Sequence, residues 1–352
     1  MIDWTKSMAR TYEHYIVDPA TWRDVRPVNG IKKCTISRDS DVATLGSATI
    51  DISDSVGECY IRTYMTVNQN GETAKVPLGT HLVQTPMSSF NGKIRNVSMD
   101  AYTPLMELKE NAPPIGYYIA KGENITANAY KLIREYARAP VVEAISESAL
   151  FNDFVAETDD TWLSYLTDLL NNGKYAFDLD ELGRILFTPK QDIESLQPVW
   201  TYSDDNSSIL LPELDMDHDM YNIPNVVEVI YSTGREHFYS KVVNDDPNSP
   251  TSTVNRGRQI VHRVTDPDLI GDPTGSQIDQ YAHQLLRDLS SLEYVITYTH
   301  GYCPVRLGDC VRINYSRAGL TNIKAKVISQ TIECTPECLV TEKAIFTNKL
   351  WG

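Results

Sequence analysis

Short stretches in which apolar and polar residues alternate, separated by turn residues, recur from residue 31 to residue 104 of this chain. Alternation at every second position is typical of strands with one buried face, and it restricts this part of the chain to a sheet. The predicted strands include residues 34–36, 48–52, 60–65 and 93–99. Asn70-Gly71 adds a strong hairpin signal. Five or six short strands at this spacing predict a small β-barrel or β-sandwich.

The middle of the chain changes to a helical pattern. Apolar residues three and four positions apart, such as Ala129, Leu132 and Ile133, predict helices that bury one face. The predicted elements are a helix that follows Asn124 and stops before Pro140, a helix from about Asp159 to Gly173, and a hairpin formed by residues 175–178 and 184–187. We therefore predict an insert of mixed helices and strands.

Strand patterns return after Pro224 and are interrupted by one helix. The predicted strands are residues 226–231, 295–299, 310–315, 323–333 and 339–347, with a helix over 276–292. The predicted fold class is mainly β with an α+β insert, in which two similar small β-barrel domains flank the insert. The predicted domains are an N-terminal arm (1–30), a first β-barrel domain (31–112), an α+β insert domain (113–223) and a second β-barrel domain with one helix (224–352).

Two distant segments share a short motif. Residues 76–82 and 305–311 both read V-x-L-G-x-x-[LV], and each is followed by a strand that begins near a lysine. Two interpretations stay open, because short β motifs also match by chance. If the match reflects structure, one barrel is used twice along the chain.

Charge and apolar content exclude several classes of function. The chain has 32 Lys and Arg residues against 47 Asp and Glu residues, a formal net charge of −15, so it lacks a chain-wide cationic surface for nucleic-acid phosphates. No apolar run reaches the ~18 residues of a membrane span, and the first residues carry no secretory leader pattern. We expect the chain to fold in a cytoplasm, where its six cysteines stay reduced.

The order of these elements resembles a known family. The resemblance rests on residues 90–100, 102–109, 115–118, 162–187, 225–229, 244–252, 257–260 and 307–311, which follow one another in the family's order. On these residues the chain resembles the tail-hub (baseplate hub) proteins of tailed bacteriophages, whose fold is shared with the base of the type VI secretion spike. The resemblance covers about residue 31 to the end. The chain ends at Trp351-Gly352 without an appended lysozyme, peptidase, fibre or needle domain, so the resemblance implies no enzyme activity.

The resemblance implies a structural role in a virion tail. Three copies would form a homotrimeric ring that is threefold in sequence and nearly sixfold in shape, closed by rotation. Such a ring would stack on a hexameric tail tube or distal-tail ring and seat a spike or fibre protein. Its channel would pass the tape-measure protein and then DNA, which an acidic wall would not retain. The protein would be assembled in the host cytoplasm and act at the tail tip.

The cysteines are the candidate metal ligands. Thiolates suit zinc and iron–sulfur clusters, and four of the six cysteines lie near one another in sequence, namely Cys303, Cys310, Cys334 and Cys338. Their spacing lacks the C-x2-C knuckles of a zinc ribbon, and Cys310 stands where an apolar strand residue is expected. We therefore favour plain packing and predict no metal and no cofactor.

Other candidate sites are weaker. The acidic run Asp215-Met216-Asp217-His218-Asp219 could bind a divalent cation, but it lacks the glycine and the distal glutamate of an EF-hand loop, so a solvated link is favoured. The small basic cluster at residues 256–263 would face DNA or an acidic neighbour, or form a solvated loop. Its members are Arg256, Arg258 and Arg263.

Enzyme activity finds little support in the motifs. The seven histidines lie without an H-E-x-x-H motif, and neither G-x-S-x-G nor a Walker loop occurs. No local arrangement of carboxylates marks a glycosidase. The rival interpretation is a β-rich module that binds or hydrolyses glycans at a cell envelope. It predicts a monomer with glycan binding or cleavage.

Overall fold

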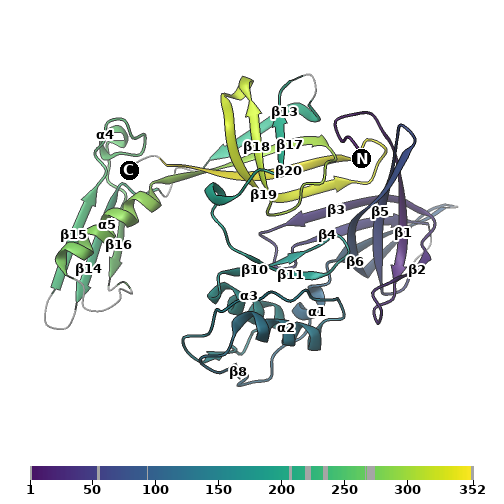
Figure 1. Ribbon diagram of the computed structural model, residues 1–352, viewed down its shortest axis with the longest axis horizontal. Helices are drawn as coiled ribbons and strands as arrows, with labels where there is room; N and C mark the ends of the chain where they lie inside the picture. Colours follow the sequence, from purple (N-terminus) through teal and green to yellow (C-terminus); the bar gives the residue numbers. More distant parts are fainter. Residues whose placement is uncertain are drawn as a thin grey trace. The chain divides into compact units, whose positions relative to one another are not determined.

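A computed structural model describes residues 2–349 except 54–55, 93, 206–207, 219–222, 233–236, 266 and 268–273 (Figure 1). The chain is mainly β with few helices, which confirms the predicted fold class. It divides into two compact units. The first is Met1–Leu214 with Tyr298–Ala344, and the second is Asp215–Thr297 with Ile345–Gly352. The four-part domain division predicted from the sequence stays a prediction.

The N-terminal part of the first unit is an antiparallel sheet in the order β3-β4-β7-β6-β5-β1-β2. Its strands are β1 (Ala9–Val17), β2 (Asp24–Pro27), β3 (Ile31–Asp39), β4 (Gly46–Ile52), β5 (Cys59–Gln69), β6 (Glu72–Asn91) and β7 (Ile94–Tyr102). The alternating apolar residues of these strands, among them Ile36, Ile50 and Met65, are buried together in one core. Asn70-Gly71 forms the turn between β5 and β6, with both residues at positive φ.

Strand β1 lies within residues 1–30, the segment predicted from the sequence as an N-terminal arm. It pairs with β5 along its whole length, from Ala9 opposite Asn68 to Val17 opposite Tyr60. Residues 9–17 of the predicted N-terminal arm therefore form a regular strand of the sheet. Their alternation is masked because several residues of the sequence ARTYEHYIV are polar or aromatic and only half-buried.

The insert follows β7 and packs around two helices. Its elements are α1 (Met106–Lys109), β8 (Tyr118–Ile119), α2 (Ile125–Tyr136), β9 (Phe154–Val155), α3 (Trp162–Asn172), β10 (Tyr175–Leu179) and β11 (Ile185–Pro189). The side chain of Asn124 caps α2 by accepting from the Ala127 N–H, and Thr161 forms a capping box with Ser164 at the start of α3. The apolar faces of both helices share one core, in which Trp162 is fully buried. The predicted helices and hairpin of the insert are confirmed.

The C-terminal part of the first unit continues the sheet through β19. Its elements are η1 (Ile193–Ser195), β12 (Trp200–Ser203), β13 (Leu210–His218), β17 (Ser291–Gly301), β18 (Cys310–Tyr315), η2 (Ser316–Ala318), β19 (Leu320–Glu333) and β20 (Leu339–Lys349). Strand β19 pairs with β3, for example Ile332 opposite Ile36, so strands from both ends of the chain lie side by side. Among the described residues, the strand order is an open path from β13 to β2, and closure of each half into a barrel stays a prediction.

The second unit contains a smaller sheet of its own, in the order β15-β14-β16. Its elements are β14 (Val226–Ser232), β15 (His237–Val243), α4 (Thr253–Arg256), β16 (Val261–Thr265) and α5 (Gly275–Leu289). Helix α5 packs its face of Ile278, Ala282 and Leu286 on this sheet. The sequence analysis extended the helix to Leu292, but the helix ends at Leu289 and Leu292 is a buried residue of β17. Strands β13, β17 and β20 run from the first unit into the second.

Candidate functional site: the anchored turn of the insert

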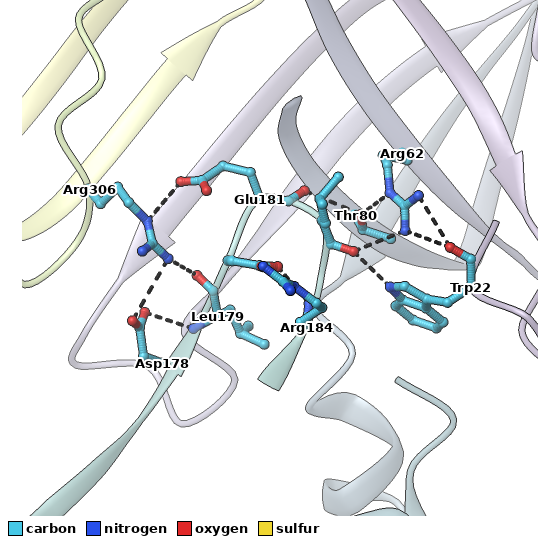
Figure 2. A network of polar contacts seen from close by, with 10 residues as sticks. Trp22, Arg62, Thr80, Asp178, Leu179, Glu181, Arg184 and Arg306 are labelled. Carbon is cyan, nitrogen blue, oxygen red and sulfur yellow. Dashed lines mark hydrogen bonds and ion pairs between the residues drawn. The ribbon is translucent and has the colours of Figure 1, made fainter. Parts of the chain in front are cut away.

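The turn between β10 and β11 is one of the points where the insert contacts the rest of the first unit (Figure 2). Gly183 donates its N–H to the Asp180 carbonyl at 2.9 Å and has a φ of +75°, a conformation that favours glycine. A Cβ atom at Gly183 would lie 2.8 Å from Thr80 Cβ. Glycine is therefore required both by the turn and by the close approach of β6.

On one side, Arg306 holds the turn (Figure 2). Arg306 Nε donates to Glu181 Oε1 at 3.0 Å, and its guanidinium also donates to the Leu179 carbonyl at 2.8 Å. The same guanidinium lies 3.8 Å from the Asp178 carboxylate. Arg38 of β3 adds a second charge 3.5 Å from Glu181 Oε1. Glu181 is thereby shared by two arginines that are far apart in the sequence.

On the other side, strand β5 and the loop between β1 and β2 hold the turn through its backbone (Figure 2). Trp22 Nε1 and the Arg62 guanidinium both donate to the Leu182 carbonyl, at 2.7 and 3.0 Å. Arg62 is itself fixed by Thr80 Oγ1 at 2.9 Å and by the Asp24 carboxylate at 2.9 Å. The turn therefore ties the insert to both ends of the chain at once.

The two V-x-L-G segments both reach this turn, but by different local structures. The first lies in β6, where Leu78 sits at an irregularity in the pairing with β5 and its carbonyl accepts from Arg38 at 2.7 Å. The second is the loop before β18, where Gly308 has a φ of +86°. Gly79 has no positive φ, and what excludes a side chain there is the His81 ring. The two segments thus share a sequence motif but not a backbone conformation.

The space beside the turn is small. A cavity of about 40 Å³ is lined by residues such as Leu78, Thr103, Glu181 and Leu307. That volume suits a few water molecules and no sugar ring. Burial raises the pKa of Asp178 and of Asp309 despite the nearby Arg306 charge. The arrangement has the chemistry of a structural anchor.

A second polar cluster is sealed inside the C-terminal part of the sheet. Glu342 Oε1 lies 3.3 Å from His300 Nε2, and both side chains are 0% exposed. Tyr298 donates to Glu342 Oε2 at 2.8 Å, and Gln330 donates to Oε1 at 2.5 Å. Tyr202 Oη lies 3.1 Å from His300 Nε2. The side chains that bind the Glu342 carboxylate are all buried.

His300 and Glu342 each stabilise the charged form of the other. Burial alone would lower the pKa of His300, but its contacts with Cys303 and Glu342 outweigh burial and raise the pKa to about 10. Burial alone would raise the pKa of Glu342, but the hydrogen bond and charge of His300 hold it below its ordinary value. The pair is an internal ion pair, and a substrate has no access to it.

Comparison with known proteins yields matches only among solved structures, since no protein-family model and no curated protein matches the chain. The tail protein from Neisseria meningitidis MC58 matches with a TM-score of 0.64 and 15% identity, over 96% of this chain and 97% of that chain. The 43 kDa tail protein of prophage MuSo2 from Shewanella oneidensis matches with a TM-score of 0.64 and 12% identity, over 96% and 98%. The chain has the fold of these tail proteins.

A further solved structure shares the fold. A chain of a PdpA–VgrG complex matches with a TM-score of 0.58 and 8% identity, over 97% of this chain and 65% of that chain. The expected likeness to tail-hub and spike-base folds is confirmed at the level of fold.

Within the tail-protein fold, Cys334 and Cys338 lie in the same core of the N-terminal sheet, whereas Cys303 and Cys310 lie elsewhere. Cys303 contacts Tyr202 and His300, and Cys310 is a buried residue at the start of β18. Cys334 lies opposite Cys34, and its N–H donates to the Cys34 carbonyl at 3.0 Å. Among the residues that the structure describes, no three His, Cys, Asp or Glu side chains gather as a metal site. That the chain binds no metal stays a prediction.

The acidic run at 215–219 is not the solvated link that the sequence analysis favoured. Residues 215–218 are the exposed end of strand β13, and the His218 ring packs 5.1 Å from the Tyr294 ring. Asp219 lies outside the described residues. The strand was missed because its residues are almost all exposed and several are acidic, which gives little apolar alternation.

Two of the three arginines of residues 256–263 bind other groups of the chain. Arg263 binds Glu228 Oε2 at 2.6 Å, and Arg256 donates to the Ile223 carbonyl at 3.1 Å. Arg258 is exposed, and its carbonyl accepts from Asn225. Their functional role stays untested.

Sequence reasoning missed the residues that hold the anchored turn. Residues 181–183 were recognised only as a hairpin turn, and Arg306 only as part of a repeated motif. Nothing in the sequence links Glu181 to Arg306, because the pair joins positions 125 residues apart.

No described helix is both long enough and apolar enough to cross a membrane.

Proposed function

We propose that this protein is the structural hub of a phage tail tip or baseplate. Three copies form a ring that is threefold in sequence and nearly sixfold in shape, and the ring connects a hexameric tail tube or distal-tail ring to a threefold spike or fibre. The observation that carries the proposal is the likeness to two tail proteins over almost the whole length of all three chains.

The internal construction supports a load-bearing ring subunit. Strands from both ends of the chain share one sheet through the β3–β19 pairing, and the anchored turn fastens the insert to that sheet from two sides. A single exposed ion pair contributes little to the stability of a fold. A subunit that transmits force between tail components therefore needs several connections between its parts.

The proposed role is not enzymatic. The His300–Glu342 ion pair is fully buried, and the cavity beside the anchored turn has a volume of about 40 Å³, which suits a few water molecules. No observation in the described residues favours the alternative of a glycan-binding or glycan-hydrolysing module.

The channel of the ring would pass the tape-measure protein and then DNA without binding DNA specifically. The net charge of −15 supports this proposal, because DNA is retained by contacts between phosphates and Lys or Arg side chains. Assembly would take place in the host cytoplasm, and the finished protein would reside in the virion tail.

Mass photometry of the purified protein tests the ring. We expect a species with three times the protomer mass of 39.7 kDa, either alone or after addition of a neighbouring tail-ring protein. A protein that stays monomeric under both conditions and is absent from tail particles contradicts the proposal.

A further inference from the structure

An extended segment of the insert presents an unusual surface. From Ile145 to Glu157, every odd-numbered residue is exposed, and every even-numbered residue except Asn152 is buried or half-buried. We call the odd-numbered residues of this segment the outward row. The alternation is that of a strand lying on a protein core with one face outward.

The segment is held in place on its inner side. Its backbone runs antiparallel to residues 117–125, with the Ala156 N–H bonded to the Tyr117 carbonyl at 2.9 Å and the Leu150 N–H bonded to the Glu123 carbonyl at 3.0 Å. Leu150 is buried in the core of the insert. The outward row is therefore ordered by the fold itself.

The chemistry of the outward row combines large apolar side chains with acids. Ile145, Phe151 and Val155 are 94, 89 and 58% exposed, and they alternate with Glu147, Asp153 and Glu157. Tyr118, which lies directly opposite Val155 across the β8–β9 pair, is also 58% exposed. Exposed apolar side chains gathered on one strand mark an interaction surface more often than they mark ordinary solvent-facing residues.

The charge of this region has one sign. Between Pro140 and Gly173 the chain has seven Asp and Glu residues and no Lys, Arg or His. On the paired segment, the backbone N–H of Lys121 donates to Asp153 Oδ1 at 2.8 Å. A partner that covers the apolar side chains must therefore meet several carboxylates, and cationic groups match them best.

We propose that the outward row is a docking surface for an extended, lysine- or arginine-rich segment of another protein that also carries apolar side chains. Apolar side chains of the partner cover Ile145, Phe151 and Val155, and its cationic groups lie beside the glutamates. Period-two alternation on both sides would set the register, as in strand pairing. The proposal does not depend on the trimeric ring.

The experiment measures binding of a fluorescent synthetic peptide of alternating lysine and leucine to the full-length protein by anisotropy. A peptide with serine in place of leucine is the control ligand. We expect the leucine peptide to bind at least about tenfold more tightly than the serine peptide. Equal binding of the two peptides, or no binding of either, overturns the proposal.

Two variants locate the binding. Ile145→Ser with Phe151→Ser should weaken binding about tenfold, whereas Val25→Ser with Val199→Ser, which also removes two exposed apolar side chains, should leave it unchanged. Glu147→Gln with Glu157→Gln should weaken binding about threefold or more at low salt, against no change for the exposed control pair Asp279→Asn with Glu293→Gln. Equal losses in test and control variants overturn the proposal.

The competing explanation is that the outward row is a contact between copies of this chain, and mass photometry of the variant tests it. If the leucine peptide does not bind and Ile145→Ser with Phe151→Ser also breaks the oligomer seen by mass photometry, the outward row is a contact between copies and the proposal of a different partner is wrong. Peptide binding and particle mass are measured separately, so the docking proposal and the ring proposal can fail independently.

Discussion

Arg306 and Arg184 both bind carboxylates of the anchored turn, but only Arg306 connects the turn to a distant segment of the chain. Arg306 joins Glu181 and the Leu179 carbonyl to the loop before β18, whereas Arg184 binds Asp180 within the same turn and is 49% exposed. We predict that Arg306→Ala lowers the free energy of unfolding by about 2 kcal/mol, because it leaves a half-buried Glu181 with one fewer partner. Arg184→Ala should cost less than about 1 kcal/mol. Urea denaturation measures both, and equal costs would contradict the role given to Arg306.

Buried histidines set the expected pH dependence of stability. The pKa of His300 rises from 6.5 to about 10 on folding, so its stabilising contribution is complete below pH 6.5 and disappears as pH rises toward 10. Burial lowers the pKa of His14 to about 4 and that of His81, which also faces the Arg38 charge, to about 3. These two histidines favour the unfolded chain as pH falls below 6.5.

We therefore predict greatest stability near pH 6.5, with a loss on both sides. Denaturation of the double variant His300→Gln with Glu342→Gln should keep the loss on the acid side and show a much smaller loss between pH 6.5 and 9. The double variant removes both charges, so no unpaired buried carboxylate complicates the profile. An alkaline loss of the same size in the wild type and the double variant would show that the buried pair is not the cause.

At the scale of elements, the hairpin β10–β11 depends on one glycine. Gly183→Ala should destabilise the protein by about 2–4 kcal/mol, because alanine must adopt a φ of +75° and its Cβ would lie 2.8 Å from Thr80 Cβ. Gly122 has a similar φ of +86° with open space around it, so Gly122→Ala should cost about 1 kcal/mol. Thermal unfolding of the two variants checks the difference. Similar shifts would mean that the turn moves freely away from β6.

Elements that depend on local patterns were predictable, and elements that depend on distant partners were not. Helix α3 follows from the capping residue Thr161 and the spacing of its apolar residues, all within one short segment. Strand β1 is defined by its pairing with β5, and its own residues are mostly half-buried, so its sequence carries a weak signal. His300 could have been recognised as inward-facing, because it shares the period-two buried face of β17 with Ile296 and Tyr298. Glu342 likewise shares the period-two buried face of β20 with Val340 and Ala344, but no local pattern indicates that it pairs with His300.

At the scale of the whole molecule, the order of elements carried more information than any motif. The order of strands, insert and strands predicted a tail-hub-like fold, and the solved structures of two tail proteins confirm the fold. The long-range contacts that stabilise this arrangement of elements cannot be predicted from local sequence patterns. Ile36 pairs with Ile332 from the opposite end of the chain, and Glu181 binds Arg306 across 125 positions. Such pairs form because the complete sheet brings the segments together.

In the proposed function, three copies of this chain form the ring at a tail tip. A cryo-EM reconstruction of tail particles containing the chain, computed without imposed symmetry, tests this arrangement. We predict a threefold ring around an open channel, with six similar sheet lobes toward the tail tube and three seats toward the spike or fibre. A single copy per particle, or copies placed away from the tail axis, would contradict the account.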